Sequence, residues 1–413
     1  MLQSKLFLKT KRKISKEKAI SARLLIRGGF IEKLASGIYN FLPLGFLVLK
    51  KIERIIREEM KKIGGQEILL ATLHPKEIWE KTGRWEKMGD LYKIKENGSQ
   101  FALGPTHEEV ITPLVKKYIS SYKDLPVFLF QIQIKFRKEL RAKGGLLRTK
   151  EFLMKDLYSF HATKEDLDSY YEKVKEAYFK IFERCNIKEK TYLTFASGGT
   201  FSKFSHEFQT ICESGEDTIF ICQKCKQAIN KEIKLQTKSC PNCGSKKFKK
   251  EKAIEVGNIF KLMTKFSKPF ELTFLNKEGK REYVLMGCYG IGLGRLMATI
   301  VEVNHDKKGI IWPGEVAPFL IHLIPIGNVR KVSDKIYKNL KEKFEILYDD
   351  REKESPGEKF QDADLIGIPL RLVVSEKTLK KNSVEIKLRK EKKVKLVKIK
   401  SLKREIEKCS KRI

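Results

Sequence analysis

The chain has 413 residues, with 86 Lys and Arg against 52 Asp and Glu, which gives a formal net charge of +34. This length exceeds what one compact core spans and predicts two or three domains. The charge predicts an anionic partner such as a polyphosphate or a nucleic acid, although a generally lysine-rich proteome would also raise it. Residues 1–13 lack an apolar core, and the apolar stretch 316–329 is too short to span a membrane. We therefore expect a cytosolic protein without a signal peptide or membrane anchor.

The N-terminal part predicts a helix, a hairpin-like loop and a second helix, followed by a strand. Apolar residues recur at helical spacing from Val48 to Met60, with Lys and Arg between them, and Gly64 and Gly65 end the helix. Residues 66–73 then form a β-rich run that is typical of an interface strand.

Thr106 and Glu109 match the pattern of a capping box, which would open a helix from His107 to Lys117. The alternative is a binding role, in which Thr106 and Glu108 accept hydrogen bonds from a cationic ligand. The local pattern leaves both interpretations open.

Residues 132–152 predict a phosphate and base site. Apolar and polar residues alternate from 132 to 136, which indicates a strand, and the glycine-containing turn 142–145 separates it from a second strand. Arg137 and Glu139 would then share one strand face, where a guanidinium can clamp a phosphate and a carboxylate can accept from the amine of adenine. We expect Phe152 to stack on the base.

A second glycine-rich segment lies about a hundred and forty residues later, with Gly290, Gly292 and Gly294 directly before a helix predicted from Arg295 to Val303. A backbone without side chains can lie close under a nucleotide there. Each segment alone is weak evidence, since alternating glycines also mark tight packing and Arg-x-Glu is usually a solvated strand face. Their order and separation are far more specific.

Four cysteines form a separate pattern. Cys222-x-x-Cys225 and Cys240-x-x-Cys243 are separated by fourteen residues, and residues 241–244 favour a tight turn. This spacing is typical of a zinc ribbon, whereas disulfides are disfavoured in a reducing cytosol. Four thiolates leave no open position, so a structural role is expected. The lysines that follow could contact RNA or simply form a solvated face.

The C-terminal part, from Val316 onward, alternates apolar runs with helical stretches, which predicts a small α/β domain with a mostly parallel sheet. The predicted strands are 319–324, 344–347 and 370–374, and the predicted helices are 331–343 and 362–366. Strand-like residues 384–388 and 394–399 are expected to complete the sheet.

Together these features resemble motifs 2 and 3 of the class II aminoacyl-tRNA synthetases, and nearly the whole chain resembles the bacterial-type prolyl-tRNA synthetases. The matching segments are Gly37–Gly45, Leu103–Glu109, Gly144–Phe152, Ser205–Phe208, Met286–Gly290 and Asp362–Pro369. The resemblance implies an α+β catalytic domain with an antiparallel sheet in residues 1–216 and 254–315. It also implies a zinc-ribbon insertion in 217–253 and an α/β anticodon-binding domain in 316–413.

The activity that the resemblance implies is ATP- and Mg²⁺-dependent activation of proline, followed by transfer to tRNA(Pro), by a homodimer. The implied ATP site consists of Arg137, Glu139, Arg148, Phe152, Gly292, Gly294 and Arg295. The implied proline contacts are Thr106, Glu108, Arg137, His206 and Cys288. Because the proline carboxylate itself attacks the α-phosphorus, Arg137 and Arg295 would act catalytically by neutralising phosphate charge.

The anticodon contacts are expected near strand ends of the C-terminal domain, since RNA readout uses splayed bases, charged side chains and an aromatic platform. The candidates are Asp350, Arg351, Lys359 and Phe360. The alternative is that these are ordinary loop residues between Leu347 and Asp362.

Many bacterial members of the family carry a large editing domain that hydrolyses alanyl-tRNA between motifs 2 and 3. Here residues 217–254 leave room only for the cysteine segment. A pocket built for proline discriminates against alanine by only about 1–3 kcal/mol. We therefore expect alanine to be misactivated without correction in cis, so that any correction needs a separate deacylase.

Four residues depart from the family pattern. Ala71 stands where motif 1 usually has proline, Ala142 and Thr149 replace a Pro and a Gly of the motif 2 loop, and Asn258 replaces a frequent His. None of them removes a charge expected at the ATP site. The alternatives are a non-catalytic, RNA-binding paralogue and a class II ligase for threonine, serine or glycine.

Overall fold

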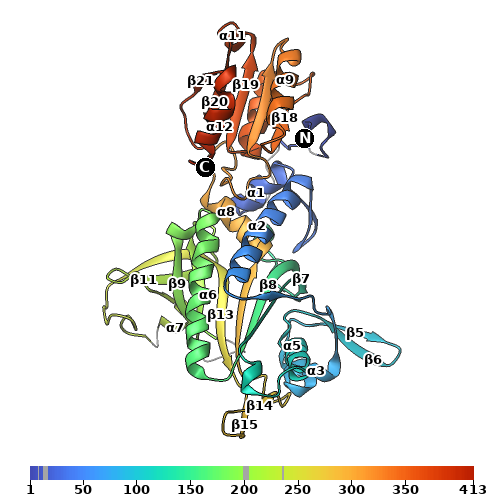
Figure 1. Cartoon of the computed structure of the whole chain (residues 1–413), viewed down its shortest axis with the longest axis vertical. Helices are drawn as coiled ribbons and strands as arrows, with labels where there is room; N and C mark the ends of the chain where they lie inside the picture. Colours follow the sequence, from blue (N-terminus) through green and yellow to red (C-terminus); the bar gives the residue numbers. More distant parts are fainter. Residues whose placement is uncertain (8, 13–16, 199–203, 235–236) are drawn as a thin grey trace. The chain divides into compact units, whose positions relative to one another are not determined.

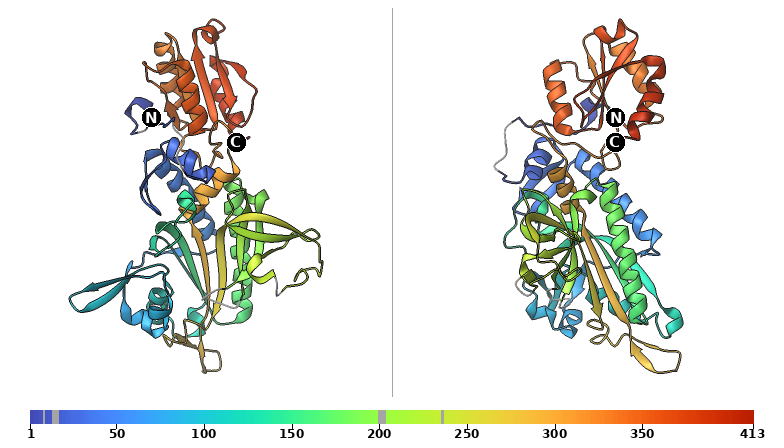
Figure 2. Two further views of the ribbon diagram at one scale, coloured as in Figure 1. Left: turned by 180° about the vertical axis from the view of Figure 1, so that it is seen from behind. Right: turned by 90° about the vertical axis from the view of Figure 1, so that its left-hand side faces the viewer.

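The computed structural model describes residues 1–7, 9–12, 17–198, 204–234 and 237–413. The chain forms two compact units, shown in Figure 1 and from two further sides in Figure 2. The central unit comprises Ser36–Ile38 and Glu53–Thr299, and the terminal unit comprises Met1–Ala35, Tyr39–Ile52 and Ile300–Ile413. Most residues before position 53 and residues 300–315 therefore group with the C-terminal part, whereas the sequence suggested the first domain for them.

The central unit is built on a sheet in which the described residues contribute nine strands, in the order β10-β9-β12-β11-β13-β16-β8-β7-β3. Their bounds are β3 Gln66–Glu67, β7 Val127–Phe136, β8 Glu151–His161, β9 Thr191–Ser197, β10 Phe204–Ile211, β11 Asp217–Cys222, β12 Ala228–Asn230, β13 Phe248–Met263 and β16 Leu285–Gly292. Neighbours are antiparallel except for the pairs β3–β7 and β12–β9. The predicted antiparallel sheet is confirmed at its centre, and the whole sheet is mixed.

Helix α6, Lys164–Arg184, lies along this sheet (Figure 1) and packs on β8, β13 and β16. The Thr163 hydroxyl caps it by accepting a hydrogen bond from the backbone N–H of Asp166 at 3.2 Å. Its buried side chains recur at i, i+3, i+4 and i+7, so the helix buries one continuous apolar stripe. This helix is not among the elements predicted above, although its periodicity is helical.

The helix predicted from Val48 to Met60 is confirmed as α2, Pro43–Lys62. It begins earlier than predicted, at a proline whose fixed φ suits the first turn. Gly64 ends it with φ +85° and donates its N–H to the Lys61 carbonyl at 3.0 Å.

The strand predicted for residues 66–73 is largely wrong. Only Gln66–Glu67 pair with β7, and Leu73 starts β4, which belongs to a separate sheet. The remaining strands are β1 Ile31–Ala35, β2 Ile38–Phe41, β4 Leu73–Pro75, β5 Tyr92–Glu96, β6 Ser99–Leu103, β14 Thr273–Leu275 and β15 Arg281–Tyr283. The remaining helices before residue 304 are α1 Ile20–Arg27, α3 Lys76–Lys81, α4 Arg84–Lys87, α5 Glu108–Lys116, α7 Lys231–Lys234 and α8 Leu293–Val303.

The cysteine-bearing segment is continuous with the central sheet. Strand β11 pairs with the first half of β13 from Asp217↔Ala253 to Cys222↔Phe248, and β12 pairs with both β11 and β9. Figures 1 and 2 show β11 and this part of β13 extending outward as a narrow arm. This segment therefore prolongs the central sheet.

The terminal unit contains a five-stranded sheet in its described residues, in the order β18-β17-β19-β20-β21. The strands are β17 Ile321–Ile326, β18 Ile346–Tyr348, β19 Leu370–Ser375, β20 Ser383–Leu388 and β21 Lys395–Lys398, and the helices are α9 Arg330–Leu340, α10 Pro356–Ile366, α11 Glu376–Leu379 and α12 Leu402–Ser410. Strands β18, β17 and β19 are parallel, whereas β20 and β21 are antiparallel additions. The predicted α/β domain, completed by the two late strands, is confirmed, but the sheet is mixed and not mostly parallel, since two of its four strand pairings are antiparallel.

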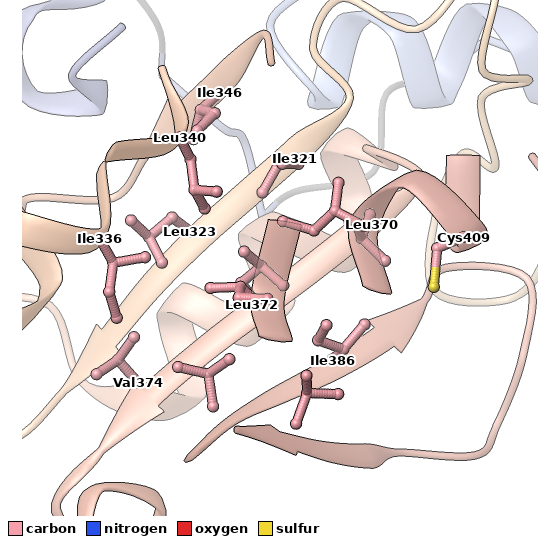
Figure 3. Close-up of a cluster of buried hydrophobic side chains, with 14 of the residues drawn as sticks. Ile321, Leu323, Ile336, Leu340, Ile346, Leu370, Leu372, Val374, Ile386 and Cys409 are labelled. Atoms are coloured by element: carbon pink, nitrogen blue, oxygen red, sulfur yellow. The ribbon is translucent and has the colours of Figure 1, made fainter. Parts of the chain in front are cut away.

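The core of this unit forms where alternate residues of the strands meet the helices. Figure 3 shows Ile321 and Leu323 of β17 and Leu370 and Leu372 of β19 packed among side chains from the neighbouring elements. Burial does not alternate along β17 and β18, because both faces of these strands are covered. Within the described residues, each helix is too short or too polar to cross a lipid bilayer.

Candidate active site

A cavity of about 580 Å³ opens in the central unit and collects most of the predicted ATP and proline residues. Its lining includes Thr106, Glu108, Arg137, Glu139, Arg148, Phe152, Gly292, Arg295 and Cys288 from the sequence prediction. It also includes Arg141, Lys143, Asp156, Glu216, Asp217, Glu255 and Asn258. Residues from segments far apart in the sequence thus meet in one pocket.

Arg137 and Glu139 line the cavity but do not share a strand face, because β7 ends at Phe136. The chain turns tightly there, with the N–H of Glu139 donating to the Arg137 carbonyl at 2.7 Å. The Arg137 guanidinium donates to the Pro105 carbonyl at 3.3 and 3.4 Å and lies 5.2 Å above the Phe152 ring. The Arg137 guanidinium and the Phe152 ring are therefore adjacent at the cavity.

Ion pairs hold the other cationic groups of the cavity in place. Arg148 Nε lies 2.7 Å from Glu139, and Arg295 lies 3.4 Å from Glu255 and 3.8 Å from Glu216. Although burial opposes the shift, the hydrogen bonds from Arg148 and from the backbone lower the pKa of Glu139. These carboxylates offset the arginine charges in the cavity without ATP.

The glycine segment runs from β16 into α8, which begins at Leu293, two residues before the predicted start. Gly292 ends β16 and lines the cavity. Gly294 lies in the first turn of α8 and is not among the lining residues, so its predicted contact with ATP stays a prediction.

Glu108 is fully buried and accepts two hydrogen bonds at the cavity wall. The Thr106 hydroxyl donates at 2.5 Å and the Cys288 thiol at 3.1 Å. Burial, together with the Glu108 charge, raises the pKa of Cys288, so the thiol remains protonated and can donate. The capping interpretation of Thr106 is wrong, because the N-cap of α5 is His107 and no side chain caps it.

The structure does not bring His206 to the cavity lining. It lies on β10, where its Nδ1 shares a hydrogen bond of 2.8 Å with the Tyr171 hydroxyl of α6 and its ring packs on Phe195. Burial lowers its pKa to about 4, so the ring is neutral. His206 therefore packs against α6 and Phe195 in the structure, and its predicted contact with proline stays a prediction.

Several charged residues at or beneath the cavity were missed by the sequence patterns. Asp156 lines the cavity, and Lys135, His107 and Arg84 are buried next to it or next to Glu108. Arg84 pairs with Glu109 at 2.9 Å and lies 3.6 Å from Glu108. The only signal was the alternation of polar residues in the β7 sequence.

A second buried lysine, Lys155, gives a prediction for pH dependence. It donates to the Tyr178 hydroxyl at 2.6 Å, and burial lowers its pKa to about 7. Between pH 7 and about 10 the unfolded chain keeps a proton that the folded chain has lost, so stability rises with pH. In urea unfolding, the rise of the unfolding free energy with pH should be smaller in Lys155→Met than in the unmodified protein, by up to about 1.4 kcal/mol per pH unit. An unchanged slope would show that Lys155 stays charged in the folded protein.

Comparisons with known proteins agree with this site. Residues 92–304 match the family described as tRNA synthetase class II core domain (G, H, P, S and T), and residues 321–409 match the anticodon binding domain. A curated proline-tRNA ligase of Dehalococcoides mccartyi is 35% identical over 97% of this chain and 98% of the relative. The chain belongs to the prolyl-tRNA synthetase family of class II enzymes. A proline-tRNA ligase of Geotalea daltonii is 34% identical over 93% of this chain and 95% of the relative.

A solved structure gives the same fold. The prolyl-tRNA synthetase of Giardia lamblia, in complex with prolyl-adenylate, matches with a TM-score of 0.78 and 22% identity. The match covers 94% of this chain and 78% of the other chain.

In this synthetase the four anticodon candidates cluster around β18 and α10 of the terminal unit. Asp350 accepts from the backbone N–H and the hydroxyl of Ser4 at 2.9 and 2.6 Å. Lys359 and Phe360 are helical residues of α10, not loop residues. Lys359 is buried, and the Phe360 ring lies 4.7 Å from the guanidinium of Arg371.

The fourth candidate, Arg351, is the centre of an ion-pair cluster. It donates to Asp349 at 2.7 and 2.8 Å and to Asp362 at 3.0 Å, and Asp362 also pairs with Arg12 at 2.8 Å. The N-terminal residues of the synthetase therefore lie against the same region of the terminal unit.

The cysteine site of the synthetase brings four sulfur atoms together. Cys222 and Cys243 lie 3.6 Å apart, Cys225 and Cys240 lie 3.5 Å apart, and all four lie within 4.8 Å of one another. Each pair sits in a tight turn closed by a backbone hydrogen bond, from Lys226 N–H to Cys222 O and from Gly244 N–H to Cys240 O. Zn–S bonds of about 2.3 Å in a tetrahedron place sulfurs about 3.8 Å apart, so the site fits zinc.

Proposed function

We infer that this chain is a proline-tRNA ligase, which activates proline with ATP and transfers the prolyl group to tRNA(Pro). The observation that carries this conclusion is the single cavity that holds a buried carboxylate, Glu108, together with the arginines Arg137, Arg148 and Arg295. The carboxylate suits the secondary ammonium of proline, and the arginines suit a triphosphate.

The first step needs positioning and charge neutralisation, not a nucleophilic side chain. The proline carboxylate attacks the α-phosphorus and pyrophosphate leaves. We assign the α-phosphate to Arg137 and the departing pyrophosphate to Arg148 and Arg295. Because these arginines pair with Glu139, Glu216 and Glu255 in the structure, ATP would exchange one set of anionic partners for another.

Where ATP phosphates supply other oxygens, acidic residues of the cavity would contribute ligands for Mg²⁺. Glu216, Asp217 and Glu255 line the same pocket as Arg295, and carboxylates are the ligands that Mg²⁺ prefers beside substrate phosphates. When bound, the ion would neutralise the phosphate charge that develops in the reaction.

The four cysteines are proposed to bind one structural zinc ion. All four ligand positions would be filled by sulfur, which leaves none for substrate. In the described residues this is the one cluster of three or more His, Cys, Asp or Glu side chains close enough to share an ion.

A homodimer is supported by apolar side chains that the central unit leaves exposed. Leu69, Leu73 and Ile134 are 75%, 45% and 39% exposed, and the first two lie within the segment 66–73 that was predicted as an interface strand. A protein that sediments as a monomer at micromolar concentration would contradict a dimer.

Amino-acid-dependent exchange of pyrophosphate into ATP tests the proposed function. Proline should support strong exchange and alanine weak exchange, whereas threonine, serine and glycine should support none above background. Transfer of labelled proline to tRNA(Pro) should follow. If folded, zinc-replete protein is silent with all five amino acids, the RNA-binding paralogue becomes the better interpretation.

Absence of editing in cis is a further prediction. The alignment with the Dehalococcoides mccartyi relative runs over 558 positions, whereas this chain has 413 residues, so at least 145 positions have no residue of this chain. This supports the proposal that the editing domain is missing and that a separate deacylase corrects alanyl-tRNA. Purified protein should hydrolyse alanyl-tRNA(Pro) no faster than the spontaneous rate. Rapid deacylation by the purified chain alone would contradict it.

A further inference from the structure

We propose that Lys135 and Asp156 are positioning residues for proline recognition, which hold the Thr106–Glu108 loop from beneath. This inference rests on the proposed function, because it concerns how the same pocket binds its amino acid. Neither residue is used by the chemistry described above.

The first observation is that strand β7 buries its polar side. Gln131 and Lys135 are 1% and 0% exposed, whereas Ile134, on the opposite side of the strand, is 39% exposed. A lysine is almost never fully buried without a partner. The side of β7 that faces the interior therefore supplies charge and hydrogen bonds beneath the cavity.

Asp156 on β8 is the partner of this charge. It lies 2.9 Å from Lys135 Nζ, and its Oδ2 accepts from the Gln131 amide and from the Tyr158 hydroxyl, both at 3.0 Å. Asp156 also lines the cavity. One carboxylate thus fixes three side chains and forms part of the pocket wall.

Two of those side chains hold His107, the residue between Thr106 and Glu108. Lys135 Nζ donates to His107 Nδ1 at 2.9 Å, and the Tyr158 hydroxyl accepts from the His107 backbone N–H at 3.0 Å. Burial and the charge of Lys135 lower the pKa of His107 to about 2, so the ring is neutral. Its Nε2 then carries the proton and donates to the Ala71 carbonyl at 3.0 Å.

The loop has little freedom around these contacts. A Cβ at Gly104 would lie 2.6 Å from the His74 ring, so the chain approaches that ring as closely as glycine allows. With His107 held at its ring and its backbone, the orientation of Thr106 and Glu108 follows. Capping the start of α5 would require only one neutral hydroxyl or amide side chain, not a buried ion pair. The buried ion pair is better explained by the need to aim two acceptors at a cationic ligand.

Two variants test the proposal by steady-state exchange kinetics. Lys135→Met removes the charge, and Tyr158→Phe removes only the hydroxyl that holds the His107 backbone. The KM for proline should rise about 10- to 100-fold, while kcat and the KM for ATP stay within about threefold. If Lys135→Met does not fold, Tyr158→Phe decides alone.

Lys155→Met is the matched control. It removes an equally buried lysine from the neighbouring strand, but that lysine bonds Tyr178 and the Tyr289 carbonyl and does not contact the loop. Its KM for proline should stay within threefold of that of the unmodified protein. The proposal is overturned if the KM for proline is unchanged in Tyr158→Phe, or if all three variants change it equally. Failure of the proposed function would look different, because the unmodified chain would then show no proline-dependent exchange.

Discussion

Replacing Arg137 with Ala is expected to lower kcat/KM for proline-dependent pyrophosphate exchange by about 10³-fold or more. Arg137 is the arginine held at the cavity between the Pro105 carbonyl and the Phe152 ring, where phosphate charge would develop. Removing one preorganised donor of this kind typically costs 10²- to 10³-fold, and arginines that act on phosphoryl groups reach 10³- to 10⁵-fold.

One further variant separates the geometry of the guanidinium from its charge, and a second variant serves as a control. Arg137→Lys keeps the charge but loses the planar pair of donors, so it should recover only a small part of the activity. Arg54→Ala removes an arginine on α2 that is 57% exposed, and it should leave exchange within twofold. If Arg137→Ala retained more than a tenth of the exchange activity, the assignment of the α-phosphate to this residue would be wrong.

Periodicity and spacing predicted the parts of the fold that are set locally. The stripe from Val48 to Met60 and the strands at 319–324 and 370–374 appear at or near their expected positions, since each depends on one face of one element. The motif residues Arg137, Arg148 and Arg295 also meet in one cavity, as the resemblance implied.

What the patterns could not give depends on partners distant in the chain. The alternation in β7 correctly indicated a strand, but Ile134 faces outward and Lys135 inward, because Asp156 on β8 compensates the buried charge. No local pattern reveals that partner. The hydrogen bond between His206 and Tyr171 of α6 likewise depends on tertiary packing that no local pattern reveals.

The boundary of the cysteine segment shows a similar limit. The spacing of Cys222, Cys225, Cys240 and Cys243 correctly brought four sulfurs together, but it did not show how the segment joins the central sheet. Strands β11 and β13 instead continue the central sheet, so Asp217 lines the cavity while Cys222 ends the same strand. Spacing identifies ligands, but pairing with β13 decides which domain they belong to.

Loss of the proposed zinc ion is expected to destabilise the central unit strongly. Cys225→Ser should reduce bound zinc from about one ion per chain to below a quarter, as measured by metal analysis of gel-filtered protein. Structural zinc contributes roughly 10–16 kcal/mol of apparent binding free energy in small domains. If zinc contributes only part of that free energy to the stability of the central unit, about 3 kcal/mol, then losing the ion lowers Tm by roughly 6–12 °C.

The matched control is Cys409→Ser, a buried cysteine of the terminal unit that should leave the zinc content unchanged. Hydrogen exchange locates the effect: in Cys225→Ser, or after a strong chelator, protection should fall first in residues 218–234 and 237–252. Because β13 also pairs with β16 next to the cavity, the inner half of that strand should keep its protection. Full zinc content in Cys225→Ser, or no zinc in the unmodified protein, would contradict a four-cysteine site. In either case the segment would be held in place only by the pairing of β11 with β13 and of β12 with β9.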